Sequence, residues 1–317
     1  MTRDTVMLPP TEVGLRAAAE ILKAGGLVAM PTETVYGLAA DARNPAAVAG
    51  IFAAKQRPAH NPLIVHVARR AEADALARFS DAAEALARAF WPGPLTLVLP
   101  LRDGHGLAPA VTAGLGSVAL RLPAHPIARS LLEAFGGPLA APSANPSGRI
   151  SPTTPAHVLS GLRGRIAAVI DAGPCAVGLE STILMVGAQG TQLLRAGAIS
   201  AEAVQAVLGT APEQPSTGRI TAPGQFASHY APRATLRLGA TSPAPGEVWI
   251  GFGPDCAGAA FSLSAAGDLD EAAARLFAVL HEADTLGQPI AVAPVPETGL
   301  GVAINDRLRR AAAPRDG

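Results

Sequence analysis

The chain has 317 residues, of which 49% are hydrophobic, and its 25 basic residues balance its 25 acidic ones. This much apolar sequence with this little net charge excludes a disordered protein, and the length favours two domains. A neutral chain with only 4% aromatic residues lacks the overall charge of a DNA-binding protein and the aromatic surface that stacks single-stranded bases. A local basic groove stays open.

The hydrophobic pattern of the first 209 residues predicts helices and strands that alternate irregularly. Helices are expected at about 11–24, 45–54, 72–77, 80–90, 127–135, 153–161 and 200–208. Strands are expected at 27–30, 63–65, 95–99, 118–122, 139–141, 167–171, 182–186 and 192–194. The first helix should end at Gly25-Gly26, with Thr153 or Thr154 and Ser200 capping later helices. This order favours an α/β sheet of mixed direction.

Residues 210–234 carry four prolines among Ser, Thr, Gly and Gln and predict an extended linker. Beyond it, strands are expected at 236–238, 248–251 and 290–293, and helices at 269–283 and from about 300. We therefore expect a large domain over 1–209, a linker over 210–234 and a small α/β domain over 235–317. The first part holds 17 basic and 14 acidic residues (net +3) and the remainder 8 and 11 (net −3), which favours an anionic ligand in the large domain.

Several classes of protein are excluded by missing motifs. The chain has two cysteines, Cys175 and Cys256, and no C-x-x-C, so a disulfide framework, a cysteine-rich zinc site and an iron–sulfur cluster are excluded. No P-loop, nucleophile elbow, H-E-x-x-H or ligand run of carboxylates occurs, and we expect no resident metal. The N-terminus has no signal-peptide core and no apolar run of about 18 residues occurs, so we expect a cytoplasmic protein without a membrane segment.

The string Pro31–Gly37 places hydrogen-bonding side chains directly after the first buried strand. Ligands bind at strand ends in α/β sheets, although an ordinary polar turn explains this string equally well when it is taken alone. Lys55 and Arg57 follow the second predicted helix, and Pro58 keeps the chain extended after them. A rigid pair of cations suits a phosphate-rich ligand, and it also complements the dipole of a helix end. Because only two of the 25 basic residues are lysines, Lys55 is a candidate for a position that needs a compact ammonium group.

Other polar residues follow or interrupt apolar strands. Arg121 lies inside an apolar strand, where an unpaired charge is costly, so it requires an anionic partner. His66 ends an apolar strand and is either a buried structural histidine or a site residue. Ser143 and Asn145 lie between prolines, which fits a site loop or a simple turn, and Arg195 follows two leucines at a strand end.

Together these strings resemble the threonylcarbamoyl-AMP synthase family, which has the YrdC-type fold. The family's P-T-E-T-V-Y-G-L, K-x-R-P…P-L-I-V-H, S-A-N-x-S-G and E-S-T-I occur here in that order at 31–38, 55–66, 143–148 and 180–183. The resemblance covers about residues 10–209, and the Pro-rich linker with Ser228–Pro232 is similar to the family's longer subtype. Ala172 and Ala196 stand where the family usually has Gly and Pro, which affects the loops around Asp171 and Arg195. The fold implied is a mixed, twisted open α/β sheet with a basic cleft, plus a small α/β C-terminal domain.

The resemblance implies an enzyme that makes threonylcarbamoyl-AMP and pyrophosphate from L-threonine, bicarbonate and ATP. The product then supplies the threonylcarbamoyl group for the adenosine beside the anticodon of some tRNAs. The reaction needs positioning and neutralisation of phosphate charge rather than a covalent nucleophile. Mg²⁺ is implied as a cation bound to the phosphates. Downstream tRNA threonylcarbamoyl transferase proteins are the implied partners, and a weak contact with tRNA is also expected.

The resemblance also implies roles for individual residues. The catalytic group around the nucleotide and the carbamate is Lys55, Arg57, Ser143 and Asn145. The ATP-binding group is Arg57, Asn61, Ser117, Ser143, Ser151, Arg195, His229 and Tyr230, the last two as a lid from the linker. The threonine-binding group is Thr34, His66, Arg121, Ala141 and Ser181.

Two other functions remain open from the sequence. A module that binds double-stranded RNA or tRNA without adenylation is disfavoured by the neutral charge. A carbamoyltransferase subunit of hydrogenase maturation is disfavoured by the missing zinc cysteines and the single copy of the fold. Release of pyrophosphate without tRNA would separate the synthase from the RNA-binding module.

Overall fold

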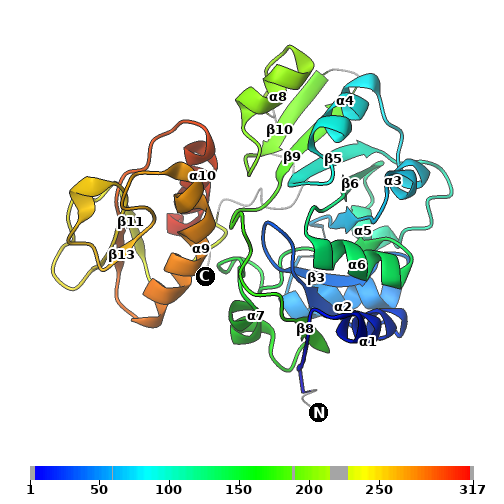
Figure 1. The fold of residues 1–317 in the computed structure, drawn as a ribbon, viewed down its shortest axis with the longest axis horizontal. Coiled ribbons are helices and arrows are strands. Elements are labelled where there is room, and N and C mark those ends of the chain that lie inside the picture. The colour runs from blue at the N-terminus through cyan, green and yellow to red at the C-terminus, as the bar shows by residue number, and fades with distance from the viewer. Residues whose placement is uncertain (1–3, 59, 188–189, 215–227, 315–317) are drawn as a thin grey trace.

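The computed structural model describes residues 4–58, 60–187, 190–214 and 228–314. Within these ranges the chain forms two sheets, each covered by helices, and the two units lie side by side (Figure 1). The larger sheet has the strand order β1-β8-β2-β3-β7-β4-β6-β5-β9-β10. Its strands are β1 (Val6–Leu8), β2 (Val28–Met30), β3 (Gly37–Asp41), β4 (Ile64–His66), β5 (Leu95–Pro100), β6 (Ser117–Arg121), β7 (Leu139–Ala140), β8 (Ala168–Ile170), β9 (Thr182–Gly187) and β10 (Gly190–Arg195).

The larger sheet is mixed, as the irregular order of predicted elements indicates. Parallel pairs such as β4 with β6 and β5 with β9 stand beside antiparallel pairs such as β2 with β3 and β5 with β6. Two of its strands, β1 and β3, are absent from the sequence prediction. The β3 segment Gly37–Asp41 contains two alanines and no β-branched or aromatic residue, so strand propensity does not reveal it.

Helices cover both faces of the larger sheet, and most of them begin at a side-chain cap. They are α1 (Glu12–Lys23), α2 (Pro45–Lys55), α3 (Arg70–Leu76), α4 (Asp81–Phe90), α5 (Pro109–Thr112), α6 (Pro126–Phe135), α7 (Pro155–Leu162) and α8 (Ala201–Leu208). The side chains of Thr154 and Ser200 accept hydrogen bonds from the first turns of α7 and α8, which confirms the expected caps. Helix α1 ends at Lys23 with Ala24 as its C-cap, and Gly25 follows with a φ of +80°, a left-handed conformation that favours glycine.

The second sheet is parallel throughout, in the order β11-β14-β12-β13. Its strands are β11 (Leu236–Leu238), β12 (Val248–Gly251), β13 (Phe261–Ser262) and β14 (Ile290–Val292), with helices α9 (Leu269–Thr285) and α10 (Leu300–Ala312). In Figure 1 these two helices stand between the small sheet and the larger unit. Strand β13 has only two residues, too short a segment for a periodic pattern to identify.

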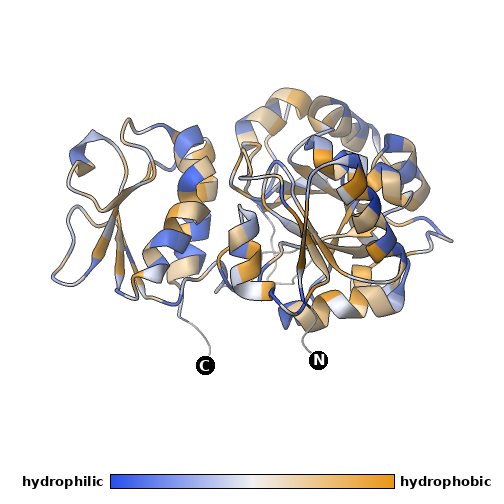
Figure 2. Ribbon diagram, turned by 60° about the horizontal axis from the view of Figure 1, so that its bottom comes forward, coloured by the Kyte–Doolittle hydropathy of each residue, from blue (hydrophilic) through white to orange (hydrophobic). Residues whose placement is uncertain are grey.

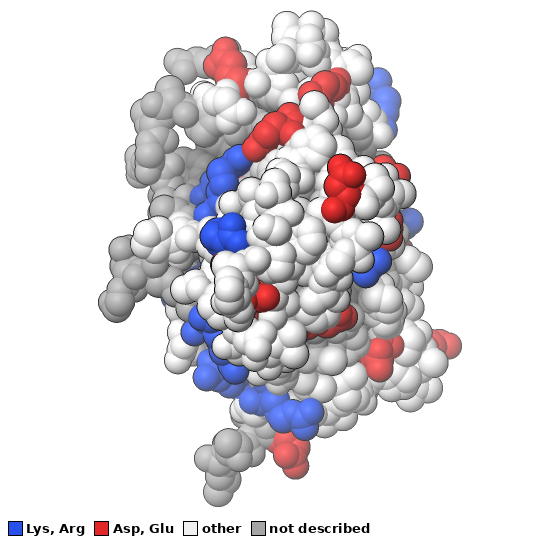
Figure 3. Space-filling view, turned by 90° about the vertical axis from the view of Figure 1, so that its left-hand side faces the viewer, with Lys and Arg blue, Asp and Glu red and all other residues white. Residues whose placement is uncertain are grey.

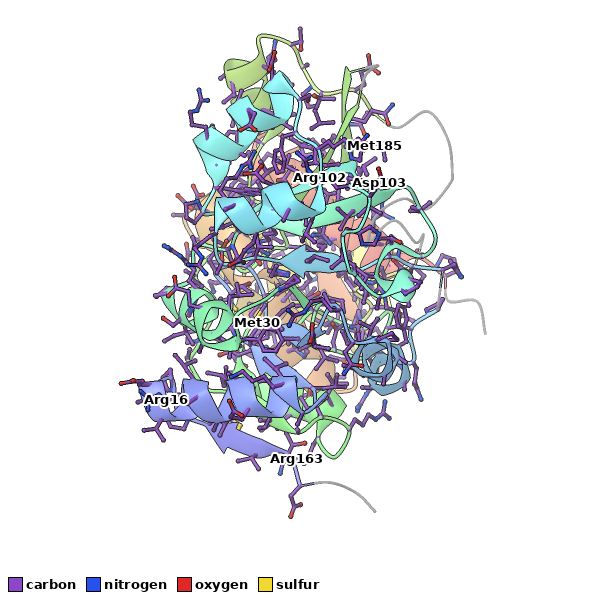
Figure 4. The ribbon with its side chains drawn as sticks, turned by 90° about the vertical axis from the view of Figure 1, so that its right-hand side faces the viewer. Arg16, Met30, Arg102, Asp103, Arg163 and Met185 are labelled. Atoms are coloured by element: carbon purple, nitrogen blue, oxygen red, sulfur yellow. The ribbon has the colours of Figure 1, made fainter. Side chains whose placement is uncertain are left out.

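The apolar core is divided between the faces of the sheets. In Figure 2 the helices of both units show hydrophilic and hydrophobic turns together, as expected of helices that bury one face. In Figure 4 Met30 of β2 lies in the interior of the larger unit, where it is fully buried, whereas Arg16 and Arg163 lie at its periphery. The core of the second unit is not closed on itself, because it also contains Val35, Ile150, Leu179 and Tyr230. The two units therefore share a packed apolar interface.

Two expectations concern segments at or beyond the described ranges. The predicted linker falls partly outside them, since residues 215–227 are not described, while 210–214 and 228–234 are. Among the described helices, none combines the length and the apolar character needed to span a membrane.

Candidate active site

A pocket opens at the side of the larger sheet where the ends of several strands meet, including the central strands β4 and β6. Strands β4 and β6 run parallel and end side by side at His66 and Arg121, which are paired in register. Both residues line the pocket. The pairing of these two strand ends therefore brings two predicted residues together at a place where ligands bind in α/β sheets. The predicted site residues in the pocket wall are Thr34, Arg57, His66, Arg121, Ala141, Ser143, Ser181, Arg195, His229 and Tyr230.

Arg121 has the anionic partner that its burial requires, and this partner is Glu33. Its Nη2 lies 2.7 Å from Oε1 of Glu33, and its Nη1 donates a hydrogen bond to Oγ1 of Thr34 at 2.9 Å. Burial raises the pKa of the Glu33 carboxyl, but the charge of Arg121 and its hydrogen bond outweigh this effect and the net shift is downward. A substrate carboxylate at this position would therefore share the guanidinium group with an ionised glutamate.

His66 offers a neutral imidazole to the same part of the pocket. Burial, and then the nearby charge of Arg121, lower the pKa of His66 to about 3. Its Nδ1 atom is buried and has no hydrogen-bond partner among the described residues. A neutral imidazole has one donating and one accepting nitrogen, so His66 can bind an amine or a hydroxyl group. Across the pocket, the hydroxyls of Ser181 and Thr96 share a hydrogen bond of 2.7 Å.

Two arginines give the other part of the pocket its positive charge. Arg57 donates to the carbonyls of Asn61 and Pro62, and Arg195 donates to the carbonyl of Ser181 through both Nε and Nη2. Burial, and then the charge of Arg195, lower the pKa of Arg57 to about 10. Both guanidinium groups are thus held by hydrogen bonds to backbone oxygens. A polyanion is the ligand that such a site favours.

Lys55 does not line the pocket but lies behind its wall. It is 1% exposed, and its Nζ donates to the carbonyl oxygens of Ser143 and Asn145, each at 2.5 Å. Burial, and then the charge of Arg57, lower the pKa of Lys55 well below its usual value. Lys55 therefore fixes the loop that carries Ser143. Asn145 in the same loop is also buried, and its Oδ1 has no partner within the described ranges.

His229 and Tyr230 close the pocket from the linker side. Their rings meet edge to face, with centroids 4.1 Å apart. Burial, and then the charges of Arg57 and Lys55, hold the pKa of His229 well below its usual value. His229 Nδ1 and the Tyr230 hydroxyl are buried and lack partners in the part of the chain that the structure describes. Both groups are therefore available to a ligand, and their role as a lid remains a prediction.

The other predicted ATP-binding residues lie outside the pocket wall. Asn61 is fully buried beside Arg57, whose Nε binds its carbonyl. Ser151 donates from Oγ to Oε1 of Glu180 at 2.5 Å, so it reaches the pocket through that carboxylate. Ser117 begins β6 four residues before Arg121, roughly 13 Å away along an extended strand. Ser117 is paired with Pro100 of β5 and does not line the pocket.

Sequence reasoning left three charged or polar groups of this region without a role. Glu33 and Glu180 lie within the strings that attracted attention, but nothing in the sequence showed that they pair with arginines. The partner of Glu180 is Arg307, which comes from α10 of the second unit, with 2.9 Å between Nε and Oε2. No local pattern marks Arg307, because its significance depends on contacts more than a hundred residues away in the chain.

Comparisons with known proteins agree on one group of relatives. A family model described as "Telomere recombination" matches residues 20–197, and one described as "Threonylcarbamoyl-AMP synthase, C-terminal domain" matches residues 199–313. The chain is 40% identical to a threonylcarbamoyl-AMP synthase of Bacillus subtilis over 94% of this chain and 92% of that one. It is 41% identical to one of Pyrococcus abyssi over 95% and 94%. The crystal structure of P. abyssi Sua5 complexed with L-threonine superimposes with a TM-score of 0.88 at 37% identity, covering 97% of each chain.

Proposed function

The chain belongs to the threonylcarbamoyl-AMP synthase family, and we propose that its pocket joins L-threonine, bicarbonate and ATP into threonylcarbamoyl-AMP and pyrophosphate. One observation carries the proposal. The pocket combines Arg121, Thr34 and His66 on one part of its wall with Arg57 and Arg195 on another. The first group suits an amino acid, and the second suits a polyphosphate.

The chemistry requires two successive steps in one enclosed place. The neutral amine of threonine attacks the carbon of bicarbonate, and loss of water leaves a carbamate. A carbamate oxygen then attacks the α-phosphorus of ATP, and pyrophosphate leaves with the electron pair of the broken P–O bond. We propose that neutral His66 binds the amine or the hydroxyl of threonine, while Arg121 binds its carboxylate. Arg57 and Arg195 stabilise the charge that develops on the phosphates.

The detailed assignment of residues is part of the same proposal. We assign the reacting centre to Lys55, Arg57, Ser143 and Asn145. ATP is assigned to Arg57, Asn61, Ser117, Ser143, Ser151, Arg195, His229 and Tyr230. Threonine is assigned to Thr34, His66, Arg121, Ala141 and Ser181. Lys55 acts mainly through the Ser143–Asn145 loop, because its ammonium group binds the two carbonyls there.

Mg²⁺ belongs to this proposal as a companion of ATP, because hard cations bind phosphate oxygens. Among the residues that the structure describes, no group of three or more His, Cys, Asp or Glu side chains could hold a metal ion. The protein's own contribution to phosphate charge is then Arg57 and Arg195. When bound, Mg²⁺ would add further neutralisation of the triphosphate.

We also propose the setting in which the product is used. The threonylcarbamoyl group is passed to downstream tRNA threonylcarbamoyl transferase proteins in the cytoplasm, where ATP and tRNA are both present. On the face drawn in Figure 3, most basic side chains lie along the left and lower margin, while a few others lie on the right among the acidic ones. Such an edge suits a weak contact with tRNA. The division into 1–209, 210–234 and 235–317 is proposed as the domain organisation of this enzyme.

The test is a pyrophosphate-release assay with purified full-length protein and without tRNA. We expect release only when L-threonine, bicarbonate and ATP are all present, and formation of one threonylcarbamoyl-AMP for each pyrophosphate. Release that does not depend on threonine would indicate simple ATP hydrolysis and contradict the proposal. Absence of release, together with retention of tRNA on a filter, would favour the RNA-binding alternative.

A further inference from the structure

Arg307 is the largest of the fully buried side chains in the described ranges, although it carries a charge. It lies on α10 of the second unit, and its neighbour Arg309 on the same helix is exposed and paired at the surface with Glu297. Burying a guanidinium group is costly unless every part of it is compensated. The position of Arg307 therefore calls for an explanation beyond the packing of α10.

The contacts of Arg307 cross from the second unit into the wall of the pocket. Its Nε donates to Oε2 of Glu180 at 2.9 Å, and its Nη1 donates to the carbonyl of Ala196 at 2.7 Å. Nη1 also binds Oδ2 of Asp306 at 2.9 Å. Glu180 lines the pocket, and Ala196 directly follows Arg195. Arg307 thus binds a carboxylate of the pocket wall and the residue that follows Arg195, which we assign to ATP.

The Glu180 carboxylate connects Arg307 to Ser151, because it binds both side chains. While Oε2 binds Arg307, Oε1 accepts the hydrogen bond from the Ser151 hydroxyl. Burial raises the pKa of Glu180, but the charges of Arg307 and Arg195 and the Ser151 hydrogen bond give a net downward shift. The carboxylate is therefore ionised with both oxygens occupied, which leaves Ser151 a single orientation.

Arg307 also holds Tyr230. Its guanidinium carbon lies 5.1 Å from the centroid of the Tyr230 ring, within the range of a cation–π contact. Tyr230 has a φ of +62°, a left-handed conformation that is unfavourable for a bulky residue and persists only when its surroundings impose it. Further contacts on this segment are the hydrogen bonds from His229 N to Arg310 O at 3.1 Å and from Ala231 N to Gly148 O at 2.8 Å.

We propose that Arg307 is a positioning residue through which the second unit organises the nucleotide part of the pocket. It acts on ATP through Ser151, by way of Glu180, and through Tyr230. Within the described ranges its hydrogen bonds go to Glu180, Ala196 and Asp306, none of which we assign to threonine. This inference rests on the proposed function, because Ser151 and Tyr230 are assigned there to ATP. The second unit is then a structural requirement for binding the nucleotide.

The first experiment measures the affinity for ATP and for L-threonine separately, by titration calorimetry. In Arg307→Met we expect the dissociation constant for ATP to rise about tenfold or more, and that for threonine to change by less than about twofold. Arg307→Lys should recover part of the ATP affinity, because it keeps the charge but loses the planar fork. Arg309→Met removes an exposed arginine of the same helix and should leave both affinities unchanged. Equal weakening of both ligands, or unchanged ATP affinity, would overturn the proposal.

Removing Arg307 alone leaves Glu180 buried without its partner, and that variant is at risk of unfolding. The double variant Arg307→Met/Glu180→Gln removes both charges of the pair, so neither partner is left buried and unpaired. We expect it to fold and still to bind ATP about as weakly as Arg307→Met. Wild-type affinity in the folded double variant would show that Arg307 only balances charge, which contradicts a positioning role.

The second experiment is independent of activity and of ATP. Amide hydrogen exchange of full-length Arg307→Lys should accelerate at His229 and Ala231, whereas Ile290 and Val292 of β14 should keep their wild-type rates. If wild-type protein releases no pyrophosphate but exchange responds in this way, the proposed function fails and the positioning of Tyr230 stands. If the wild type is active and neither exchange nor ATP affinity responds to the substitution, Arg307 has no positioning role.

Discussion

Replacement of Arg121 tests whether the pocket binds threonine where we place it. The guanidinium group forms a buried pair with Glu33, with 5% and 12% of the two side chains exposed, and also binds Thr34. Arg121→Ala leaves the Glu33 carboxylate without a partner in a place that water barely reaches. Breaking a buried pair from one side costs about 3–5 kcal/mol. For a chain of this size we expect a melting temperature lower by about 10 °C.

The double variant Arg121→Ala/Glu33→Gln separates stability from binding. Since neither charge remains, we expect it to regain more than half of the lost stability, measured by denaturant unfolding. The exposed pair of Arg78 with Asp103 is a suitable control, because Arg78→Ala should cost at most about 1 kcal/mol. A melting curve of Arg121→Ala that coincides with that of the wild type would refute the pairing on which this reasoning depends.

Arg121→Lys then tests the binding role in a folded protein. Lysine keeps a positive charge beside Glu33 but cannot present two parallel N–H groups to a carboxylate. We expect the KM for threonine to rise about tenfold while the KM for ATP changes by less than about twofold. Steady-state release of pyrophosphate measures both constants. Equal increases in the two constants would place Arg121 outside the threonine group.

Three further predictions follow from the structure. Lys55→Ala should slow adenylate formation through the loss of about 2–4 kcal/mol of transition-state stabilisation, and it should loosen the Ser143–Asn145 loop. As a control, Lys23→Ala, at an exposed lysine, should match the wild type, and near-normal turnover of Lys55→Ala would refute the role of Lys55. Burial, followed by the charge of His281, lowers the pKa of His157 to about 3 in the folded protein. Because the unfolded chain takes up this proton near pH 6.5, the free energy of unfolding should fall between pH 6.5 and 3 by up to about 1.4 kcal/mol per pH unit for each such group. His157→Gln should reduce this pH dependence in denaturant unfolding, and an unchanged slope would contradict the prediction. Truncation after Gly209 should weaken ATP binding and product formation, because it removes His229, Tyr230 and Arg307. If the truncated and full-length proteins are equally active, and both are shown to be folded by circular dichroism, the second unit only stabilises the protein or recruits a partner.

The parts of the fold that were predictable are those with a strong local pattern. Helices α1, α4 and α8 have apolar faces and side-chain caps that the sequence displays directly. Strands β1, β3 and β13 were missed because each is short or built of small residues, and each is stabilised by a neighbouring strand rather than by its own composition. Strand order depends on pairing between distant segments, and one sequence contains no direct signal for it.

The site shows the same division between local and distant information. Thr34, His66 and Arg121 were identified as candidates because polar or charged groups at the ends of apolar strands are conspicuous. Their meeting follows from the parallel pairing of β4 with β6. The partner of Arg121 turned out to be Glu33, one residue before Thr34, and the sequence showed only that some anion was required.

The buried charges explain why the two units act together. In the pocket region Lys55, Arg57 and Arg195 bring three cationic groups together, and the charge of one lowers the pKa of another. Glu180, a carboxylate in the pocket wall, binds Arg307. The part of the pocket that we propose for the nucleotide thus keeps a surplus of positive charge, which a bound polyanion would relieve. Glu180 interacts electrostatically with both Arg307 and Arg195, and burial together with the charge of Arg307 lowers the pKa of Arg195, so α10 of the second unit contributes to the electrostatics of the pocket.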